Sequence, residues 1–397
     1  MGCMEIQGAE VTDSDGVHEI VPTEVNADNG LPVINGLSGD NGLTSDNGLM
    51  SDNGLSSDNG LSSENGLQSD NGLMTTDAGR MTVSYLVKCA LASGTTLVKG
   101  SYTFAGQLGL APEWKTGACG TTCRQTISAC LMAHVNTSGQ HYGLWLIGPQ
   151  SQLGWGRSNA RPFLEAAFFG DLFRSNPTAY YCKGPDWERV PVEGRIGATM
   201  SGTPFSNPWG SNGLCNDHCT SNSDGYTSCT SSYTRPITVY RDLDTQNTYT
   251  ICEGESTSSP TCLAHTSSSS TYVTLATPSS SSTSQRWYFE RYSTTTRDGL
   301  YRIKNKSTGK YMTVASTSEN YKIGMATGST SSTGQRWNLK EILLEQLGNG
   351  SFGIQNAASL RYIDDYSYAS GNSPIQTDKP GDNWYVGQAW KLKLYTN

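Results

Sequence analysis

The chain has 397 residues, with 27 Lys plus Arg against 35 Asp plus Glu, which gives a net charge of −8 and argues against nucleic acid as a partner. Only 35% of the residues are hydrophobic and 16% are charged, so small uncharged residues, including 44 Gly, are abundant and favour strands, turns and loops. The length predicts two or three domains, and no apolar run approaches the roughly 18 to 20 residues that a membrane-spanning helix needs.

Residues 1–28 form an N-terminal leader segment, in which no basic stretch is followed by an apolar one as an intact secretory signal requires. Either the signal is missing from this chain or export uses another route. The dipeptide Gly2-Cys3 would suit the end of a truncated lipoprotein signal, in which Cys3 carries the lipid. The sequence leaves lipidation of Cys3 open.

Residues 29–75 contain a six-residue repeat close to Ser-Asp-Asn-Gly-Leu-x. This period is typical of a β-solenoid, in which the leucines from Leu31 to Leu73 would form an inner column. Burial of one Leu supplies roughly 2 kcal/mol, whereas ordering each residue costs roughly 1–2 kcal/mol, so a flexible tether is the competing interpretation. Self-association and a calcium-binding array are further alternatives, although one carboxylate per repeat is few for calcium. The repeated asparagines are Asn29, Asn35, Asn41, Asn47, Asn53, Asn59, Asn65 and Asn71.

Residues 76–242 are richer in aromatic residues and hold most of the cysteines. Of the 11 cysteines, Cys3 stands apart, eight lie between residues 89 and 229, and two lie at 252 and 262. Even numbers in each region favour disulfides, which form in oxidising compartments. We therefore expect a disulfide-rich, β-dominated α+β domain in an extracellular or cell-surface protein.

Within this region, β-branched and aromatic residues predict strands. Residues 122–135 predict a helix, because Ile127, Leu131 and Val135 recur every four residues and Thr121 or Thr122 can cap the start. The expected strands are residues 82–91, 100–104, 142–147 and 237–241, and a second helix is expected over residues 162–173.

Residues 243–397 contain three similar segments, each with a tripeptide that has Gln first and Trp third, at spacings of 50 and 53 residues. A threefold repeat of four short strands can build a closed β-barrel, in which the Trp fills the shared core and the Gln binds backbone groups. The tripeptide residues assigned to this core are Gln285, Trp287, Gln335, Trp337, Gln388 and Trp390.

With these three Gln-x-Trp tripeptides, residues 243–397 resemble the ricin-B-type β-trefoil lectins, and the resemblance implies glycans as partners. Residues 20–241 resemble, less specifically, uncharacterised secreted bacterial proteins that carry Asn-Gly-Leu repeats before a cysteine-containing domain with an Ala-Phe-Phe-Gly-like segment, here residues 167–170. The expected fold is therefore mainly β and multidomain: a repeat segment that is a tether or a β-solenoid, a disulfide-rich middle domain and a C-terminal β-trefoil.

The lectin resemblance also implies the type of sugar site: a carboxylate that accepts hydrogen bonds from two hydroxyls, an aromatic ring and an amide. The carboxylate is expected two residues after an aromatic residue, where Thr274 and Thr313 stand in the first two segments and Asp364 stands in the third. A turn in which Asp364 caps a backbone amide is the alternative. The candidate carbohydrate-binding residues are Asp364, Asp365, Tyr366, Tyr368, Asn383 and Trp384.

We predict no catalytic residue, cofactor or metal site. Cys119, at the start of the expected helix, faintly resembles a papain-type nucleophile, but Arg124 replaces the usual aromatic residue and no His motif follows. A disulfide for Cys119 and Cys123 is the preferred interpretation. A zinc site that combines these two cysteines with Cys215-x3-Cys219 and the intervening His218 is the weaker alternative.

Glycoside hydrolysis would need two carboxylates at a defined separation. Four acidic residues lie in one stretch and are interpreted as surface charges: Glu165, Asp171, Asp186 and Glu188.

The leading hypothesis is a non-enzymatic, extracellular or cell-surface carbohydrate-binding protein. One alternative is a structural subunit of an extracellular fibre that assembles through residues 29–75 or the middle domain. The other is a secreted hydrolase that its trefoil targets to glycans.

Overall fold

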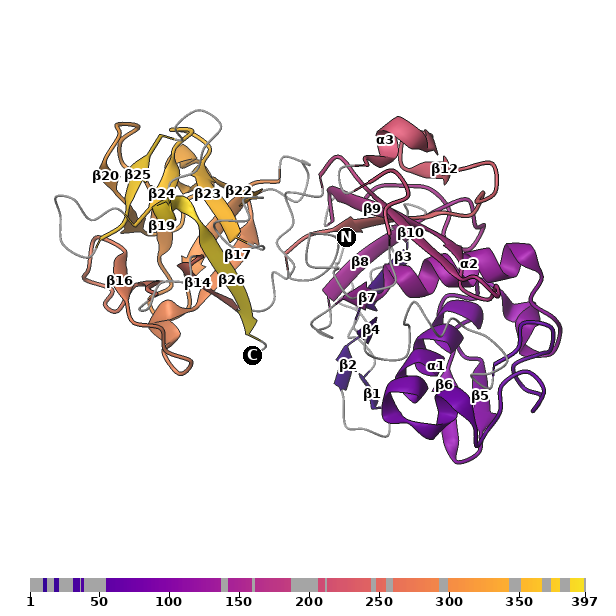
Figure 1. The fold of residues 1–397 in the computed structure, drawn as a ribbon. Coiled ribbons are helices and arrows are strands. Elements are labelled where there is room, and N and C mark those ends of the chain that lie inside the picture. The colour runs from indigo at the N-terminus through magenta and orange to yellow at the C-terminus, as the bar shows by residue number, and fades with distance from the viewer. Residues whose placement is uncertain are drawn as a thin grey trace, which may run out of the picture. The chain divides into compact units, whose positions relative to one another are not determined.

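The structure is a computed structural model that describes residues 55–136, 142–158, 161–186, 206–210, 213–243, 248–254, 260–292, 299–342, 351–365, 373–378 and 386–395, together with the backbone of four short strands nearer the N-terminus. The chain forms two compact units, the first containing Met1–Pro185 and Met200–Arg241 and the second containing Asp242–Asn397 (Figure 1). The division lies one residue from the expected boundary at 242/243.

In its described residues, the first unit contains short strands and three α-helices. Its strands are β1 (Glu10–Thr12), β2 (His18–Ile20), β3 (Leu31–Asn35), β4 (Leu37–Ser38), β5 (Thr96–Lys99), β6 (Tyr102–Ala105), β7 (Val135–Asn136), β8 (Tyr142–Ile147), β9 (Phe163–Asp171), β10 (Thr178–Lys183), β11 (Thr220–Ser221), β12 (Tyr226–Ser228) and β13 (Ile237–Arg241). Its helices are α1 (Asp77–Ala90), α2 (Thr121–Ala133) and α3 (Cys215–His218), with the 3-10 turns η2 (Gly72–Thr75) and η3 (Pro112–Lys115).

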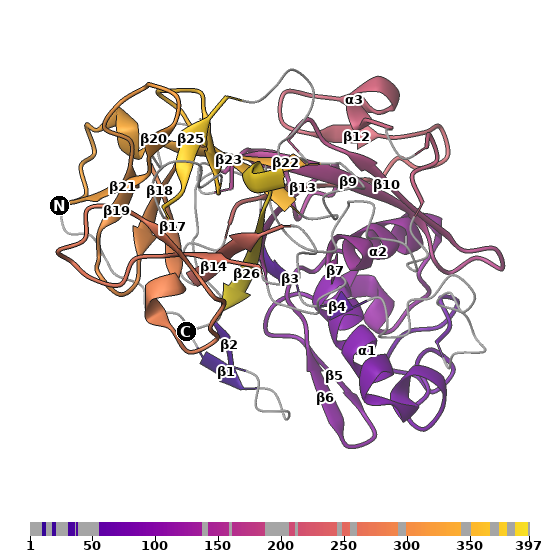
Figure 2. The ribbon, with the colours of Figure 1, turned by 60° about the vertical axis from the view of Figure 1, so that its left-hand side comes forward.

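A five-stranded antiparallel sheet in the order β10-β9-β13-β8-β3 is the centre of this unit. Helices α1 and α2 lie on one side of it, and α3 with β11 and β12 lies on the other (Figures 1 and 2). The expected strands at 142–147 and 237–241 are β8 and β13, and the expected helix at 122–135 is α2. These three predictions are confirmed, although Gly120, not a Thr, is the N-cap of α2.

Two of the expected elements have the opposite conformation. Residues 82–91 were expected as a strand, but residues 82–90 belong to helix α1 and Leu91 is its C-cap. The Thr76 hydroxyl accepts from the Gly79 amide at 3.0 Å, and Val83, Val87 and Ala90 are buried. Residues 162–173 were expected as a helix but contain strand β9, all nine residues of which are buried. A strand covered on both faces has no alternation of polar and apolar residues, so its apolar run cannot be told from that of a buried helix.

The last repeats are part of the first unit. The repeated leucines at 55, 61, 67 and 73 are all buried, at 1%, 0%, 0% and 6% exposure. The Leu61 amide donates to the Trp114 backbone oxygen at 2.9 Å, and the Trp114 indole donates to the Asn59 oxygen at 3.1 Å. The backbone forms turns instead of stacked solenoid strands. For repeats 55–75, the tether and the solenoid are therefore both wrong, because the leucines are buried against the rest of the unit.

Five disulfides are present among the described residues, which confirms the disulfide-rich prediction. They join Cys89 to Cys130, Cys119 to Cys123, Cys182 to Cys215, Cys219 to Cys229, and Cys252 to Cys262.

The second unit is a β-trefoil. Its strands are β14 (Thr248–Glu253), β15 (Cys262–Ala264), β16 (Thr274–Ala276), β17 (Trp287–Arg291), β18 (Tyr301–Asn305), β19 (Tyr311–Thr313), β20 (Tyr321–Lys322), β21 (Gly324–Ala326), β22 (Trp337–Ile342), β23 (Ser351–Asn356), β24 (Tyr362–Asp364), β25 (Ile375–Thr377) and β26 (Trp390–Tyr395), with the 3-10 turns η6 (Thr283–Gln285), η7 (Thr333–Gln335) and η9 (Val386–Gln388). Strands β14, β17, β18, β22, β23 and β26 pair in a ring that closes the barrel. The hairpins β15–β16, β19–β21 and β24–β25 complete three lobes of four strands each, which we number 1 to 3 in chain order.

Candidate functional site

The three tripeptide tryptophans show which residues of the three lobes are equivalent. Each Trp is fully buried at 0% exposure. Their indole N–H groups donate to the backbone oxygens of Leu263, Met312 and Ile363, at 3.0, 3.2 and 2.9 Å. These three acceptors therefore occupy the same place in lobes 1, 2 and 3.

The candidate carboxylate position follows this acceptor directly. It is occupied by Ala264 in lobe 1, Thr313 in lobe 2 and Asp364 in lobe 3. The sequence-based alignment of Thr274 with this position is wrong, because Thr274 lies on the partner strand of the hairpin, opposite Ala264. Lobe 3 is the one lobe with a carboxylate at this position.

The tripeptide glutamines bind backbone groups in the core. Gln335 donates to the Thr327 oxygen at 2.9 Å and accepts from the Ser329 amide at 2.9 Å, and Gln285 makes the equivalent pair of bonds in lobe 1. Gln388 donates to the Asp378 oxygen at 3.0 Å and also to the Thr377 hydroxyl at 2.7 Å. The structure thus places the six tripeptide residues in the trefoil core.

Asp364 lies beneath the surface of lobe 3, with 2% exposure. Its Oδ2 accepts from the Thr377 hydroxyl at 2.6 Å, and that hydroxyl accepts from Gln388. Because Ala326 and Ala276 occupy the place of Thr377 in the other lobes, this link between carboxylate and core is specific to lobe 3. The Thr377 hydroxyl, on the partner strand of the hairpin, thus binds Oδ2 of the carboxylate.

Asp365 is half-buried beside Asp364, and its amide donates to the Gly387 oxygen at 3.0 Å. A Cβ atom on Gly387 would lie 1.8 Å from Oδ1 of Asp365 and 2.4 Å from Oδ1 of Asp364, so only glycine leaves room for both carboxyl groups. At the equivalent position, lobe 1 has His265 and lobe 2 has Val314. Burial raises the pKa of Asp365 to about 7, and the hydrogen bond and charge of Glu253 and the charge of Asp364 act in the same direction.

Glu253 belongs to lobe 1 but reaches this site, because β14 pairs with β26 and places Glu253 opposite Trp390. Its carboxylate accepts from the Thr261 amide at 2.8 Å and the Thr261 hydroxyl at 2.6 Å, beside the Cys252–Cys262 disulfide. A hydrogen bond between the carboxyl groups of Glu253 and Asp365 requires a proton on one of them. We call Glu253, Asp364 and Asp365 the acidic cluster. The sequence analysis missed Glu253. The signal that could have identified it is its position next to Cys252.

The other four candidate residues lie outside the described part of the chain: Tyr366, Tyr368, Asn383 and Trp384. The structure therefore brings together Asp364 and Asp365 from the predicted set and adds Glu253.

The candidate catalytic groups of the first unit have structural partners. Cys119 and Cys123 form the expected disulfide, so neither is a nucleophile. Glu165 and Asp171 were expected at the surface but are buried at 2% and 1% exposure. Glu165 forms an ion pair with Arg241, and Asp171 pairs with Arg124 at 3.2 Å. Burying a charge is tolerated only when it is paired, which explains the two arginines.

Two groups of Cys and His side chains in the described residues are close enough to hold a metal ion. Every cysteine in them belongs to a disulfide, whose sulfur atoms are not thiolate ligands.

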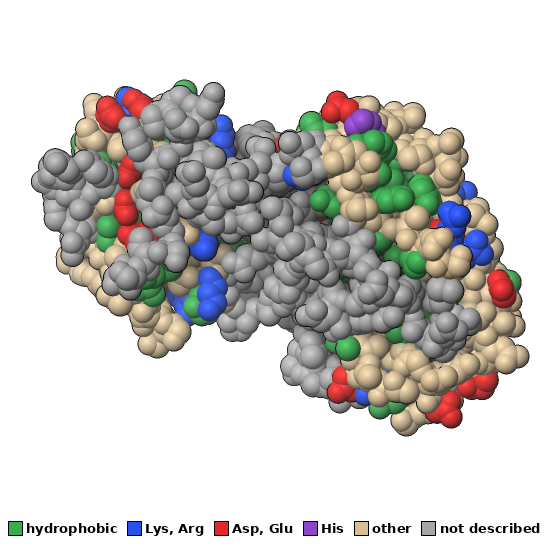
Figure 3. Space-filling view, in the orientation of Figure 1, with side chains coloured by type: hydrophobic (Ala, Val, Ile, Leu, Met, Phe, Trp, Pro, Cys, Tyr) green, Lys and Arg blue, Asp and Glu red, His purple; other side chains and the backbone are tan. Residues whose placement is uncertain are grey.

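On the face shown in Figure 3, the described basic side chains lie in small separate groups. Within the described residues, no helix is both long enough and apolar enough to cross a membrane.

Comparison with known proteins assigns the second unit. Residues 241–323 and 283–378 match the family described as ricin-type β-trefoil lectin domain-like. Among curated proteins, none matches the chain. Similar solved structures include a designed threefold-symmetric protein, ThreeFoil, with 22% identity over 36% of this chain and 96% of that one and a TM-score of 0.30.

Two fungal lectins are also similar. The Polyporus squamosus lectin, bound to a human-type influenza-binding epitope, has 16% identity over 38% of this chain and 50% of that one, with a TM-score of 0.30, so this chain spans about half its length. The Macrolepiota procera ricin B-like lectin, in complex with lactose, has 15% identity over 38% of this chain and 97% of that one, with a TM-score of 0.28. By the family match and its fold, the second unit contains a ricin-type β-trefoil lectin domain.

Proposed function

We propose that the protein is an extracellular, non-enzymatic carbohydrate-binding protein, and that lobe 3 of its trefoil binds the sugar. The observation that carries the proposal is the acidic cluster of lobe 3, in which Asp365 stands where lobe 1 has His265 and lobe 2 has Val314. Carboxylates are strong acceptors for the hydroxyl groups of sugars, since charge-assisted hydrogen bonds are about twice as strong as neutral ones. Valine, which lobe 2 has at this place, offers no such acceptor.

Within lobe 3, the half-buried Asp365 and Glu253 are the groups that contact the sugar, and the buried Asp364 supports them. This division of roles follows from exposure, because a residue with 2% exposure has little surface to offer a ligand. The hydrogen bond from Thr377 holds Asp364 in place. The remaining predicted partners, an aromatic ring and an amide, stay predictions for Tyr366, Tyr368, Asn383 and Trp384.

The first test is glycan binding by the full-length protein. We expect binding on an array of mono- and oligosaccharides, followed by a dissociation constant from titration calorimetry between about 1 mM and 1 µM. At pH 8, above the pKa of about 7, Asp365→Asn should weaken binding about tenfold, because it removes one charge-assisted hydrogen bond. Glu319→Gln, which removes an exposed carboxylate in lobe 2, is the matched control and should leave affinity unchanged.

Equal affinity of the wild type, Asp365→Asn and Glu253→Gln for the same glycan would place the sugar elsewhere. Absence of binding on the array would contradict the function itself. The extracellular location is supported by the lectin domain and the five disulfides. The alternative of a fibre assembled through the repeats finds no support in residues 55–75, because their leucines are buried within the unit.

A further inference from the structure

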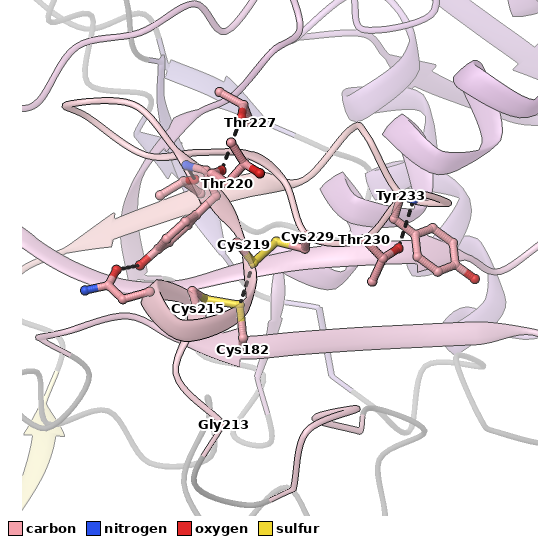
Figure 4. The surroundings of a disulfide bond; sticks show 12 residues. Cys182, Gly213, Cys215, Cys219, Thr220, Thr227, Cys229, Thr230 and Tyr233 are labelled. Atoms are coloured by element: carbon pink, nitrogen blue, oxygen red, sulfur yellow. Dashed lines mark hydrogen bonds between the residues drawn. A yellow bond between two sulfur atoms is a disulfide. The ribbon is translucent and has the colours of Figure 1, made fainter.

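Four cysteines of the first unit lie together on the α3 side of the central sheet (Figure 4). Cys182 is on β10, Cys215 begins α3, Cys219 follows α3, and Cys229 follows β12. They form two disulfides, Cys182–Cys215 and Cys219–Cys229. The two disulfides are in contact, since the sulfur atoms of Cys182 and Cys219 are 3.6 Å apart.

The single turn of α3 explains this contact. Cys215 and Cys219 are four residues apart, and the Cys219 amide donates to the Cys215 oxygen at 2.8 Å. Residues at this spacing on a helical turn point to the same side. Both sulfur atoms therefore face β10, and the sulfur atoms of Cys182, Cys215 and Cys219 lie within 4.8 Å of one another. Either Cys215 or Cys219 is thus within reach of Cys182.

The four cysteines differ in their access to solvent. Cys182, Cys215 and Cys229 are buried at 1% exposure or less, whereas Cys219 is partly exposed. Thiol–disulfide exchange depends on which sulfur an attacking thiolate can reach. An external thiolate therefore reaches these two disulfides at the sulfur of Cys219.

We propose that these four cysteines form a thiol–disulfide exchange site, at which an external dithiol reduces Cys219–Cys229 and Cys182 then changes its partner from Cys215 to Cys219. This inference is independent of the sugar site in the second unit.

The reaction has two stages. In the first, a thiolate of the dithiol attacks the sulfur of Cys219, and the electron pair of the broken bond leaves on Cys229, which takes up a proton. The second thiol of the reagent attacks its own mixed-disulfide sulfur, so the reagent leaves as a disulfide and Cys219 is left as a thiolate. The dithiol has then lost two electrons, and the Cys219–Cys229 bond has gained them.

In the second stage, the Cys219 thiolate attacks the sulfur of Cys182 across the 3.6 Å contact. The Cys182–Cys219 bond forms, the Cys182–Cys215 bond breaks, and the electron pair leaves on Cys215, which is protonated. This stage consumes no electrons, because one disulfide replaces another. The two covalent forms differ in which end of α3 is fixed to β10. The His218 ring, stacked on Trp209 with centroids 4.3 Å apart, lies next to that change.

A variant that frees Cys219 without any reductant gives the most direct test. In full-length Cys229→Ser, free thiols are blocked with N-ethylmaleimide at low pH, and the disulfides are mapped by mass spectrometry of peptides. We expect label on both Cys215 and Cys219, and a Cys182–Cys219 bridge whose amount is within about tenfold of the Cys182–Cys215 bridge, because both forms contain one disulfide. Label on Cys219 alone would overturn the proposal.

Two control variants separate this exchange from general scrambling. Cys219→Ser frees Cys229, which is not among the three mutually close sulfur atoms, so among the ten cysteines of the five disulfides only Cys229 should be labelled. Cys262→Ser frees Cys252 in the second unit, where only Cys252 should be labelled. Mixed pairing throughout either control would also count against a specific site.

The wild-type protein provides a test that does not depend on how the variants fold. Full-length protein is treated with a limiting amount of dithiothreitol, quenched with acid, blocked and mapped in the same way. Molecules with two labels among the four cysteines should form two populations. One carries the labels on Cys215 and Cys229, and the other carries them on Cys219 and Cys229. Label only on Cys219 and Cys229, or label on other disulfides while these four stay unlabelled, would refute the exchange site.

Discussion

Asp365 is a carboxyl group in a place where lobe 2 has an apolar side chain. The equivalent residue of lobe 2 is Val314, which is buried. In lobe 3, the missing side chain of Gly387 makes room for the carboxyl group, and Glu253 and Asp364 surround it with like charge. Burial and like charge both favour the protonated form, so this acid titrates near neutral pH.

This titration makes stability depend on pH in a defined direction. Burial raises the pKa of Asp365 from 3.8 to about 7, so the folded protein holds a proton that the unfolded chain has released. Stability therefore falls as pH rises between these two values. Asp365→Asn cannot ionise, so its stability relative to the wild type should rise by about 1 kcal/mol from pH 4.5 to pH 8, after allowance for solvent screening. Urea unfolding at both pH values, with Glu319→Gln as the control, measures this. A constant difference between Asp365→Asn and wild type would show that Asp365 has an ordinary pKa.

Leu360 has a backbone conformation that suits glycine. Its φ is +60°, and its side chain is 65% exposed. In lobe 2, Gly309 stands at the same distance from the corresponding asparagine, with φ +68°. Both residues donate their amide to an Asn backbone oxygen at 2.9 Å, Gly309 to Asn305 and Leu360 to Asn356.

Leu360→Gly should therefore stabilise the protein by about 1 kcal/mol, because a left-handed conformation costs a non-glycine residue roughly that amount. The reverse change, Gly309→Leu, should destabilise it by a similar amount, since space around Gly309 is open and only the backbone is affected. Thermal unfolding of both variants checks the pair. Shifts of the same sign would mean that backbone strain is not the cause.

At the scale of elements, the last repeats, residues 55–75, form tightly packed turns. Gly60 lies against the backbone of Thr116, and Gly66 lies against the backbone of Gly60. A Cβ atom on Gly66 would be 1.9 Å from the Gly60 oxygen, which is part of the backbone and cannot rotate away. The repeated Gly thus serves close approach of chain segments, while the repeated Leu fills the core beneath.

Gly66→Ala should destabilise the protein by about 2 kcal/mol, within the range measured for overpacked sites. Gly117→Ala is the matched control in the same unit, because Gly117 is exposed and its added Cβ would make an ordinary contact of 3.4 Å. Urea unfolding of both variants gives the difference. A Gly66→Ala protein as stable as the control would restore the tether interpretation of the repeats.

At the scale of the whole molecule, the chain divides into two units, each with its own core and disulfides. Four disulfides belong to the first unit and one to the second, where Cys252–Cys262 fixes the start of lobe 1 beside Glu253. The acidic cluster depends on closure of the trefoil barrel, because β14 from its first lobe pairs with β26 from its last. Residues more than 100 positions apart, Glu253 and Asp365, thereby share one site.

Local patterns were sufficient for the trefoil, for α2 and for the disulfide content. A Gln-x-Trp tripeptide at regular spacing specifies a core position wherever it occurs, and the four-residue step from Ile127 to Leu131 marks the buried side of a helix. The sequence also predicts Asp364, two residues after Tyr362, and Asp365 beside it as sugar-binding groups, and this role stays a prediction.

Packing between distant segments decided the rest. Burial on both faces made a strand of residues 163–171, and packing against η2, α2 and β6 made a helix of residues 82–90, which include β-branched residues. Contact with Trp114 orders the repeats at residues 55–75. The free energy gained by burying their own leucines could not compensate the conformational entropy that ordering costs. Glu253 joins the acidic cluster because β14 pairs with β26, and Cys219, which follows α3, contacts Cys182 on β10. These outcomes depend on free energies gained between segments far apart in the chain, which no local pattern contains.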